Sequence, residues 1–152
     1  MTTTAARTAR RDRYREWLEA QELRYSFAGE LADVSLNTRG PVTNDIPPVE
    51  RWGAILPTAR VLELVRERFG PTTILSAYRN VPYNVAVGGV GDSRHSQNDA
   101  IDFRCAASTP EQWAAFLRGL RDTSQFVGGI GTYLRQGFVH VDTRGSRADW
   151  VG

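Results

Sequence analysis

Apolar residues recur at helical spacing in three stretches of the chain. The most regular stretch follows Thr109, with apolar residues spaced i, i+3, i+4 and i+7 at Trp113, Phe116, Leu117 and Leu120. A threonine cap, a first-turn proline and a glutamine at the third position predict that a helix begins here. Residues 5–23 carry a shorter apolar stripe and predict a second helix. Arginines crowd this segment and form either a solvated helix face or a contact with an anionic surface.

Residues 49–69 predict a third helix, which Gly70 and Pro71 end. Pro57 lies inside this stretch, where it either kinks the helix or begins a second one at the first helical position. The preceding residues 26–48 show little periodicity and are rich in asparagine, glycine and proline. They predict a loop that is long for a structureless connection, so we expect it to wrap the surface or border a cleft.

Four shorter runs have the composition of strands. Residues 72–77 and 100–105 are rich in β-branched and apolar side chains, and residues 127–133 and 138–142 predict a hairpin. Successive residues of a strand alternate between its faces, so Asp102 is expected to face away from its two apolar neighbours. Together these elements predict an α+β fold, a small antiparallel sheet with flanking helices on one side.

Composition narrows the range of functions. A chain of 152 residues, 41% hydrophobic and 24% charged, is typical of one soluble domain with its own core. The net charge of +2 is too small to indicate nucleic-acid binding, and one cysteine excludes an internal disulfide or a cysteine-rich zinc site. No apolar run approaches the roughly 20 residues of a membrane span. The N-terminus lacks the apolar core of a secretory signal, so we expect a protein made in the cytoplasm. Trp150, near the C-terminus, is expected to pack as a lid on one end.

Two histidines and one aspartate offer the donors of a zinc site. His95 lies in an irregular loop, Asp102 lies on the strand that follows, and His140 lies in the apolar run FVHVD. Catalytic zinc takes three protein ligands from histidine, aspartate or glutamate and leaves one position for water. The loop between His95 and Asp102 is long enough to fold back, and His140 would come from a neighbouring strand. The sequence therefore predicts one Zn²⁺ ion.

Four motifs occur together around these residues. They are Ser76-Ala77-Tyr78-Arg79, then Tyr83-Asn84 with Val87-Gly88-Gly89, then Ser93-Arg94-His95 through Ala100-Ile101-Asp102, and finally Phe138-Val139-His140. In this combination the chain resembles the zinc D-Ala-D-Ala carboxypeptidases and their endopeptidase relatives, which act on bacterial cell-wall peptides and share their architecture with the hedgehog signalling domain. The resemblance covers about residues 47–150. We therefore expect an N-terminal helical extension over residues 1–25 and a zinc peptidase-like domain over residues 26–152.

The resemblance also implies roles for individual residues. It implies that the zinc ligands are His95, Asp102 and His140. Arg79 would bind a substrate carboxylate or carbonyl oxygen and stabilise the oxyanion, since a guanidinium stays charged at every relevant pH; the alternative is a surface salt bridge. Ser93 would orient a ligand, touch the substrate or serve only as a turn residue. Tyr78 is expected to contact the substrate.

The chain departs from the family pattern at two positions. Asn98 stands where the family usually has glycine, but asparagine tolerates left-handed backbone better than most residues, so the loop is expected to survive. Gly137 stands where many relatives have the glutamate that acts as general base. The role of general base therefore cannot be assigned to a glutamate at this position, so another residue must accept the proton.

Asp142 is the candidate replacement for this base. On a strand, residues two apart point to the same side, so Asp142 would face the metal pocket with His140 and Phe138. An apolar wall at Phe138 would raise the pKa of Asp142 towards a useful value. Asp142 could instead orient a ligand, or form a salt bridge with Arg144 or Arg147.

These observations predict zinc-dependent hydrolysis of an amide bond in peptidoglycan stem peptides or cross-links, by a carboxypeptidase or an endopeptidase. The missing glutamate leaves an alternative, a catalytically silent zinc-bound module that binds a peptide or forms part of a phage-like particle. We expect a monomer whose partner is a peptidoglycan peptide. Made without a signal peptide, such an enzyme would reach the cell wall after lysis, as an endolysin, or inside a phage-like particle.

Overall fold

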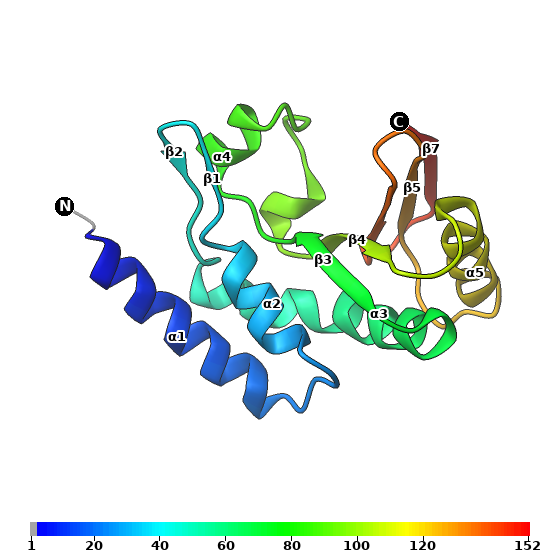
Figure 1. Cartoon of the computed structure of the whole chain (residues 1–152), viewed down its shortest axis with the longest axis horizontal. Helices are drawn as coiled ribbons and strands as arrows, with labels where there is room; N and C mark the ends of the chain where they lie inside the picture. Colours follow the sequence, from blue (N-terminus) through cyan, green and yellow to red (C-terminus); the bar gives the residue numbers. More distant parts are fainter. Residues whose placement is uncertain (1–2) are drawn as a thin grey trace.

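The computed structural model describes residues 3–152, and a five-stranded sheet runs through its centre (Figure 1). The strands lie in the order β3 (Thr72–Ser76), β4 (Ala100–Cys105), β6 (Phe138–Asp142), β5 (Gly129–Tyr133) and β7 (Ala148–Val151). All neighbours pair antiparallel except β5 and β7, which are parallel. The predicted α+β fold is therefore confirmed, with one parallel strand at an edge of the sheet.

Helices and short 3-10 segments surround this sheet, and a small hairpin stands beside it. The helices are α1 (Thr4–Ala20), α2 (Phe27–Val34), α3 (Leu56–Phe69), α4 (Val81–Ala86) and α5 (Pro110–Asp122). The 3-10 segments are η1 (Val49–Ile55) and η2 (Arg94–Gln97), and the hairpin consists of β1 (Thr38–Arg39) and β2 (Val42–Thr43). Within residues 3–152, none of the helices has the length and apolar character needed to cross a membrane.

The helix-start signals in the sequence act as predicted. The Thr109 hydroxyl accepts a hydrogen bond from the backbone N–H of Gln112, which satisfies one of the free N–H groups at the start of α5. Pro57 lies in the first turn of α3, where a missing N–H costs nothing. It therefore begins a second helix after η1 and does not kink a continuous one.

The prediction of a structureless loop over residues 26–48 is wrong. This stretch contains the eight-residue helix α2 and the β1–β2 hairpin. A helix this short is marginal by itself, and α2 is stabilised because Phe27 and Leu31, one turn apart, are fully buried. Eight residues offer too few turns for the periodicity to stand out in the sequence.

The tail also contains an element that the sequence did not reveal, the edge strand β7. Its parallel pairing with β5 places Trp150 beside Gly131. The indole N–H of Trp150 donates to the hydroxyl of Tyr133 at 2.8 Å, and the indole lies 5.0 Å from the ring of His140. Trp150 is half-buried and packs over Gly131 at the edge of the sheet, beside His140.

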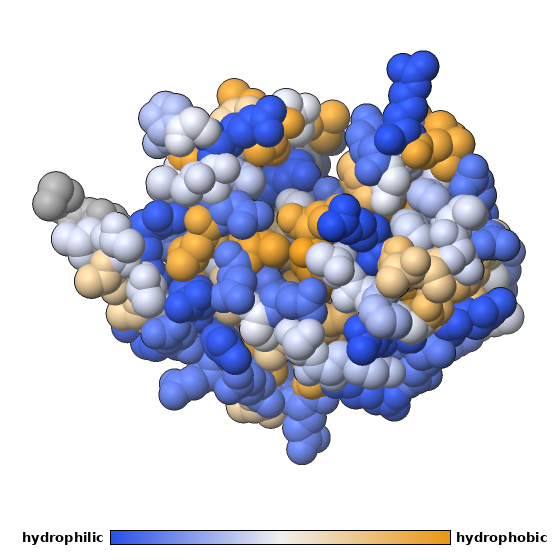
Figure 2. Space-filling model, viewed as in Figure 1, coloured by the Kyte–Doolittle hydropathy of each residue, from blue (hydrophilic) through white to orange (hydrophobic). Residues whose placement is uncertain are grey.

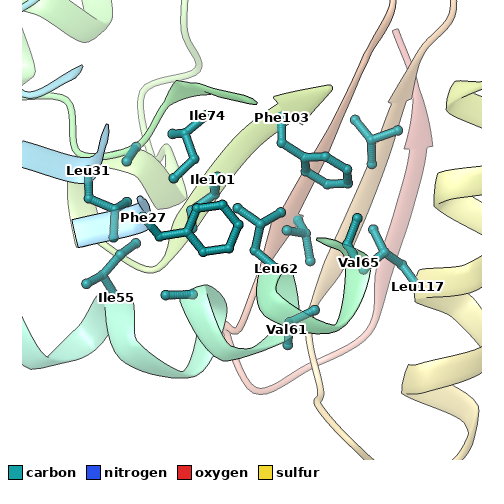
Figure 3. Close-up of a cluster of buried hydrophobic side chains, with 14 of the residues drawn as sticks. Phe27, Leu31, Ile55, Val61, Leu62, Val65, Ile74, Ile101, Phe103 and Leu117 are labelled. Carbon is teal, nitrogen blue, oxygen red and sulfur yellow. The ribbon is translucent and has the colours of Figure 1, made fainter. Parts of the chain in front are cut away.

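The hydrophobic core lies between the helices and one face of the sheet. Figure 3 shows side chains of α2, α3 and α5 meeting Ile101 and Phe103 of β4. Fully burying an aliphatic or aromatic side chain of this size contributes about 1.5–3 kcal/mol. Asp102 lies between these two residues in sequence and so points to the opposite face, as predicted.

Helix α1 packs into the same core through Tyr14 and Leu18. Several of its arginines contact acidic or carbonyl groups of the following segment: Arg7 with the carbonyl of Asn44, Arg10 with Asp45, and Arg11 with Asp33. These contacts fasten α1 to residues 33–45. They favour a structural role for the basic face over binding to an anionic surface.

Gly131→Ala is expected to lower the free energy of unfolding by about 1–3 kcal/mol, as overpacking does. A Cβ at this position would lie 2.5 Å from two ring atoms of Trp150, so the indole would have to move. Gly119→Ala is the matched control, because a Cβ on this residue, in the last turn of α5, would meet no atom within 4 Å. The control should gain about 0.5–1 kcal/mol from helix propensity. Denaturant unfolding measures both, and equal stabilities would contradict this account of the Trp150 packing.

Candidate metal centre

The polar face of the sheet gathers the two histidines and one aspartate of the predicted zinc site. Asp102 of β4 and His140 of β6 are direct partners in the antiparallel register, so their side chains emerge side by side. His95 comes from η2, just before β4. All three side chains are buried, and each offers a ligand atom within 4.8 Å of the other two.

The three side chains converge on one oxygen. Asp102 Oδ1 lies 3.2 Å from Nε2 of His95 and 3.0 Å from Nδ1 of His140. The two imidazole rings meet nearly edge to face, with centroids 5.1 Å apart. Two nitrogen donors and a carboxylate oxygen are therefore directed at one small volume.

Each of these three side chains also forms a hydrogen bond with a group outside the cluster. His95 Nδ1 lies 2.6 Å from the carbonyl oxygen of Ala77, and His140 Nε2 lies 2.8 Å from Oδ2 of Asp142. The guanidinium of Arg79 donates to Asp102 Oδ2 at 3.1 Å. Metal-binding histidines typically use their second ring nitrogen in this way, which fixes the orientation of the ring. The donor set and its outer contacts fit a bound transition metal.

Local sequence explains how η2 presents His95. The Ser93 hydroxyl accepts a hydrogen bond from the His95 backbone N–H at 3.2 Å and caps the turn. Asn98 ends the turn with a left-handed φ of 59°, the conformation expected where the family usually has glycine. The backbone N–H of Arg79 donates to the carbonyl of His95 at 3.2 Å and joins the turn to the segment after β3.

Arg79 lies beside the cluster with its guanidinium held at three points. Nε donates to Ser76 Oγ at 3.0 Å, Nη1 to Asn84 Oδ1 at 3.3 Å and Nη2 to Asp102. The sequence left a surface salt bridge as an alternative. The Arg79 side chain is instead mostly buried and pairs with a residue of the cluster. A cation fixed here lowers the energy of negative charge nearby.

The charges of the cluster stabilise one another. Burial on its own raises the pKa of Asp102, but His95 and His140 favour the ionised carboxylate more strongly and hold its pKa well below the ordinary value. Burial lowers the pKa of His140, yet its hydrogen bonds with Asp102 and Asp142 outweigh burial and raise it. Asp102 is therefore a carboxylate at neutral pH, the form that binds a metal.

A cavity of about 660 Å³ opens over the cluster, within the usual range for ligand sites. Residues 87–90 and 92–95 form one wall, and Tyr133, Phe138 and Trp150 form an aromatic wall opposite. The molecular surface is hollowed between α4 and the C-terminal strands (Figure 2). Asp102 and His140 line this cavity, so they are accessible to a ligand bound in it.

Two residues predicted to contact substrate lie in different places. Ser93 lines the cavity and also caps the turn of His95. Tyr78 lines a different cavity, with Trp52 and Arg13. Although Tyr78 precedes Arg79 in the sequence, the structure does not bring it to the metal-binding cluster.

Asp142 shares the side of β6 with His140, as predicted, but its surroundings are not those of a free base. Its carboxylate is fully buried and accepts hydrogen bonds from His140, from Arg144 (2.8 and 2.7 Å) and from the Gly129 N–H (2.9 Å). Burial raises its pKa, but Arg144, His140 and Gly129 outweigh burial and hold the pKa well below the ordinary value.

The expected rise in the pKa of Asp142 is therefore wrong. The apolar wall at Phe138 lines the cavity as expected, but the carboxylate of Asp142 is turned to charged and polar partners. Both alternatives that the sequence left open occur together, because Asp142 orients His140 and also forms a salt bridge with Arg144. Arg147 pairs with Asp122 instead.

Sequence reasoning overlooked one carboxylate of the cavity, that of Asp92. It lines the cavity together with Asp102, its side chain is exposed, and within residues 3–152 it forms no ion pair. Its only signal in the sequence is its position, three residues before His95 at the end of a glycine-rich loop. The path of that loop decides where the side chain lies, and spacing alone does not predict the path.

Comparison with known families agrees with this geometry. The sequence profile of peptidase M15 matches residues 25–142. The chain belongs to the M15 peptidase family. The match contains His95, Asp102 and His140 and begins after α1, while a search of curated proteins finds no match. Membership confirms the resemblance noted from the motifs and makes a metallopeptidase the function class of this site.

Proposed function

We propose that this M15 peptidase hydrolyses an amide bond in peptidoglycan stem peptides or cross-links, with one zinc ion held by His95, Asp102 and His140. The observation that carries the proposal is the convergence of three buried donors at the floor of a cavity that Arg79 also lines. The resemblance to cell-wall carboxypeptidases and endopeptidases supports the choice of substrate.

Zinc fits this donor set better than calcium or magnesium. Two imidazole nitrogens and one carboxylate oxygen are the ligands of a catalytic zinc site, which keeps a position open for water. Calcium and magnesium prefer sites made of oxygen ligands. Bound zinc would polarise the scissile carbonyl and lower the pKa of water at the site.

The residues around the cluster supply the remaining functions. Arg79 stabilises the negative charge that develops on the carbonyl oxygen of the substrate, since its guanidinium is held rigidly beside the cluster. Asp142 holds the ring of His140 in place. Asp92 is the exposed carboxylate of the cavity, and it takes the proton from the attacking water and returns it to the leaving amine.

The walls of the cavity suit an extended peptide with small side chains. Tyr133 and Phe138 stack in parallel with centroids 4.5 Å apart, and the Tyr133 hydroxyl fixes Trp150 by a hydrogen bond. These three rings form a rigid apolar surface opposite residues 88–90. A peptide between these walls displaces water from the region where the amide is cut.

Purified peptidoglycan incubated with the protein should release new peptides, detected by mass spectrometry. A chelator should stop the reaction and added zinc should restore it. Loss of terminal D-alanine alone would identify a carboxypeptidase, and opened cross-links would identify an endopeptidase. Full zinc content without any product would instead support the silent metal-bound module.

Two variants test whether this digestion depends on the proposed zinc ligands. His95→Ala should lose both zinc and activity, because it removes one of three ligands. Gln97→Ala changes a residue that lines the same cavity outside the cluster, so it should retain zinc. Full zinc content in His95→Ala would exclude the proposed ligand set.

Arg79→Ala should slow hydrolysis by about 10²–10³-fold, the usual effect of removing a group that stabilises an oxyanion. Arg79→Lys keeps the charge but cannot contact Ser76, Asn84 and Asp102 together, so it should recover only part of the rate. Steady-state kinetics on zinc-loaded protein measure the effect. Wild-type rates for Arg79→Ala would show that this arginine serves only to hold Asp102.

Asp92→Asn and Asp142→Asn should affect different quantities. Asp92→Asn should lower turnover by about 10²–10⁴-fold at full zinc content, as loss of a general base does. Asp142→Asn should weaken zinc binding by about 10–100-fold, as loss of a group that orients a ligand does. Turnover and zinc affinity are measured for both. If Asp92→Asn were active while Asp142→Asn bound zinc fully but was inactive, the general base would be Asp142 and not Asp92.

A further inference from the structure

Arg144 follows β6 and reaches across the sheet beside the metal-binding cluster. Its Nε donates to Oδ1 of Asp142 at 2.8 Å, and its Nη2 donates to Oδ2 at 2.7 Å. The same Oδ2 lies 2.8 Å from Nε2 of His140, so two short hydrogen bonds connect Arg144 to a member of the cluster. A Cβ on Gly129 would lie 2.9 Å from Nη2, which places the guanidinium over the backbone of β5.

The pairing with Asp142 leaves part of the guanidinium free. An arginine carries five N–H donors, and this pair uses two of them. Within residues 3–152, the side chain of Arg144 donates to no other group. It lines the cavity over the cluster, and 26% of its surface is exposed. Arg144 is therefore a fixed cation with unused donors at the wall of the cavity.

Two cations lie on opposite sides of the cluster along the sheet. Arg79 follows the edge strand β3 and pairs with Asp102 on β4. Arg144 lies over β5, with its guanidinium carbon 5.5 Å from the centroid of the Trp150 ring on β7. The strands β4 and β6, which carry Asp102 and His140, run between them. An extended peptide that crosses the sheet can thus place one oxygen group at each arginine.

We propose that Arg144 determines specificity by binding a free carboxylate of the stem peptide, one or two residues from the amide that is cut. An extended peptide advances about 3.3–3.6 Å per residue, so such a carboxylate reaches past His140 when the scissile carbonyl lies at the cluster. A planar guanidinium matches the two oxygens of a carboxylate and binds them by charge-assisted hydrogen bonds. The inference rests on the proposed function because it places a stem peptide in this cavity.

The other charged groups of the cavity are less suited to this role. Arg79 is held by three groups and serves the carbonyl oxygen. Arg94 also lines the cavity, but within residues 3–152 its partner Asp99 forms no hydrogen bond with the predicted zinc ligands. The exposed carboxylate of Asp92 forms no ion pair with Arg144 in the same range, so it does not occupy the free donors.

Two carboxylates of a stem peptide have the required position. One is the C-terminal carboxylate, next to the last peptide bond. The other is the α-carboxylate of a glutamate that is linked through its side chain and stays free within the chain. Acetyl-D-alanyl-D-alanine represents the first, and acetyl-L-alanyl-D-glutamate γ-methylamide represents the second. Each peptide is prepared with this carboxylate free and as its amide.

The ratio of kcat/KM for the acid and amide forms tests the proposal. Unaltered protein should prefer the acid form of one peptide by about 10–100-fold, the usual effect of a hydrogen bond to a charged group. Arg144→Gln should reduce this preference to less than about threefold, mainly through KM for the acid form. A preference confined to one peptide identifies the carboxylate that Arg144 binds.

The amide form is the internal reference for this measurement. A loss of zinc, or of the orientation of His140, slows the acid and amide forms alike and leaves their ratio unchanged. An unchanged ratio in Arg144→Gln would show that Arg144 only holds Asp142, and would overturn the proposal. If that variant does not fold because buried Asp142 is left unpaired, Arg144→Gln combined with Asp142→Asn removes both charges. The double variant should lose the preference, and a retained preference would overturn the proposal.

Arg94→Gln is the matched control. It removes an equal charge from the same cavity and from a similar pair with a carboxylate. The preference for the acid form should stay within about twofold of that of the unaltered protein, because exposed charges are screened by solvent and salt. A loss of preference equal to that in Arg144→Gln would assign the effect to the total charge of the cavity and overturn the proposal.

Binding without turnover separates this inference from the proposed function. In chelator-treated protein, calorimetry should show the acid form of the same peptide binding about tenfold more tightly than its amide, and Arg144→Gln should abolish the difference. Equal affinities of the two forms for the unaltered protein would overturn the proposal. If zinc-loaded protein cleaves neither peptide while the difference in affinity depends on Arg144, the proposed function fails and Arg144 is confirmed as a carboxylate-binding residue.

Discussion

The metal centre depends on the antiparallel register of β4 and β6, which places Asp102 opposite His140. The same register directs Ile101 and Val141 into the core on the other face. A slip by one residue would bury the two polar side chains in the core and expose the apolar ones, so hydrophobic burial fixes the geometry of the polar cluster. The pairing of β4 with β6 thus determines both the burial of the core residues and the geometry of the metal centre.

Burying ionisable groups beside one another is costly unless each is paired. Here every member of the cluster has a second partner: a carbonyl for His95, a carboxylate for His140 and a guanidinium for Asp102. Those partners come from the segment after β3 and from β6 itself, so the sheet and the segments that adjoin it supply both the ligands and their partners. Removing one partner would leave a buried charge uncompensated, which typically costs about 3–5 kcal/mol.

Much of this arrangement could be predicted from the sequence, and the failures share a physical cause. The alternation of apolar and polar residues around Asp102 predicted β4, and the run FVHVD predicted β6. The four motifs predicted the cluster of His95, Asp102 and His140. The helix at Phe27 and the edge strand at Trp150 were missed because each is short and is stabilised by contacts with distant parts of the chain. The surroundings of Asp142 were misjudged because strand alternation gives the side on which a carboxylate lies but not the arginine that reaches it.

The close approach of Trp150 to Gly131 makes the aromatic wall of the cavity a two-residue unit. A larger residue at position 131 is compatible with the fold only if the ring at position 150 shrinks, so the two positions should co-vary among relatives. The same coupling constrains redesign of the substrate range. Any larger residue at Gly131 requires a second substitution at Trp150. The wall opposite is constrained for a different reason, because a Cβ on Gly89 would overlap the Asn84 side chain and Gly88 has a left-handed φ of 77°.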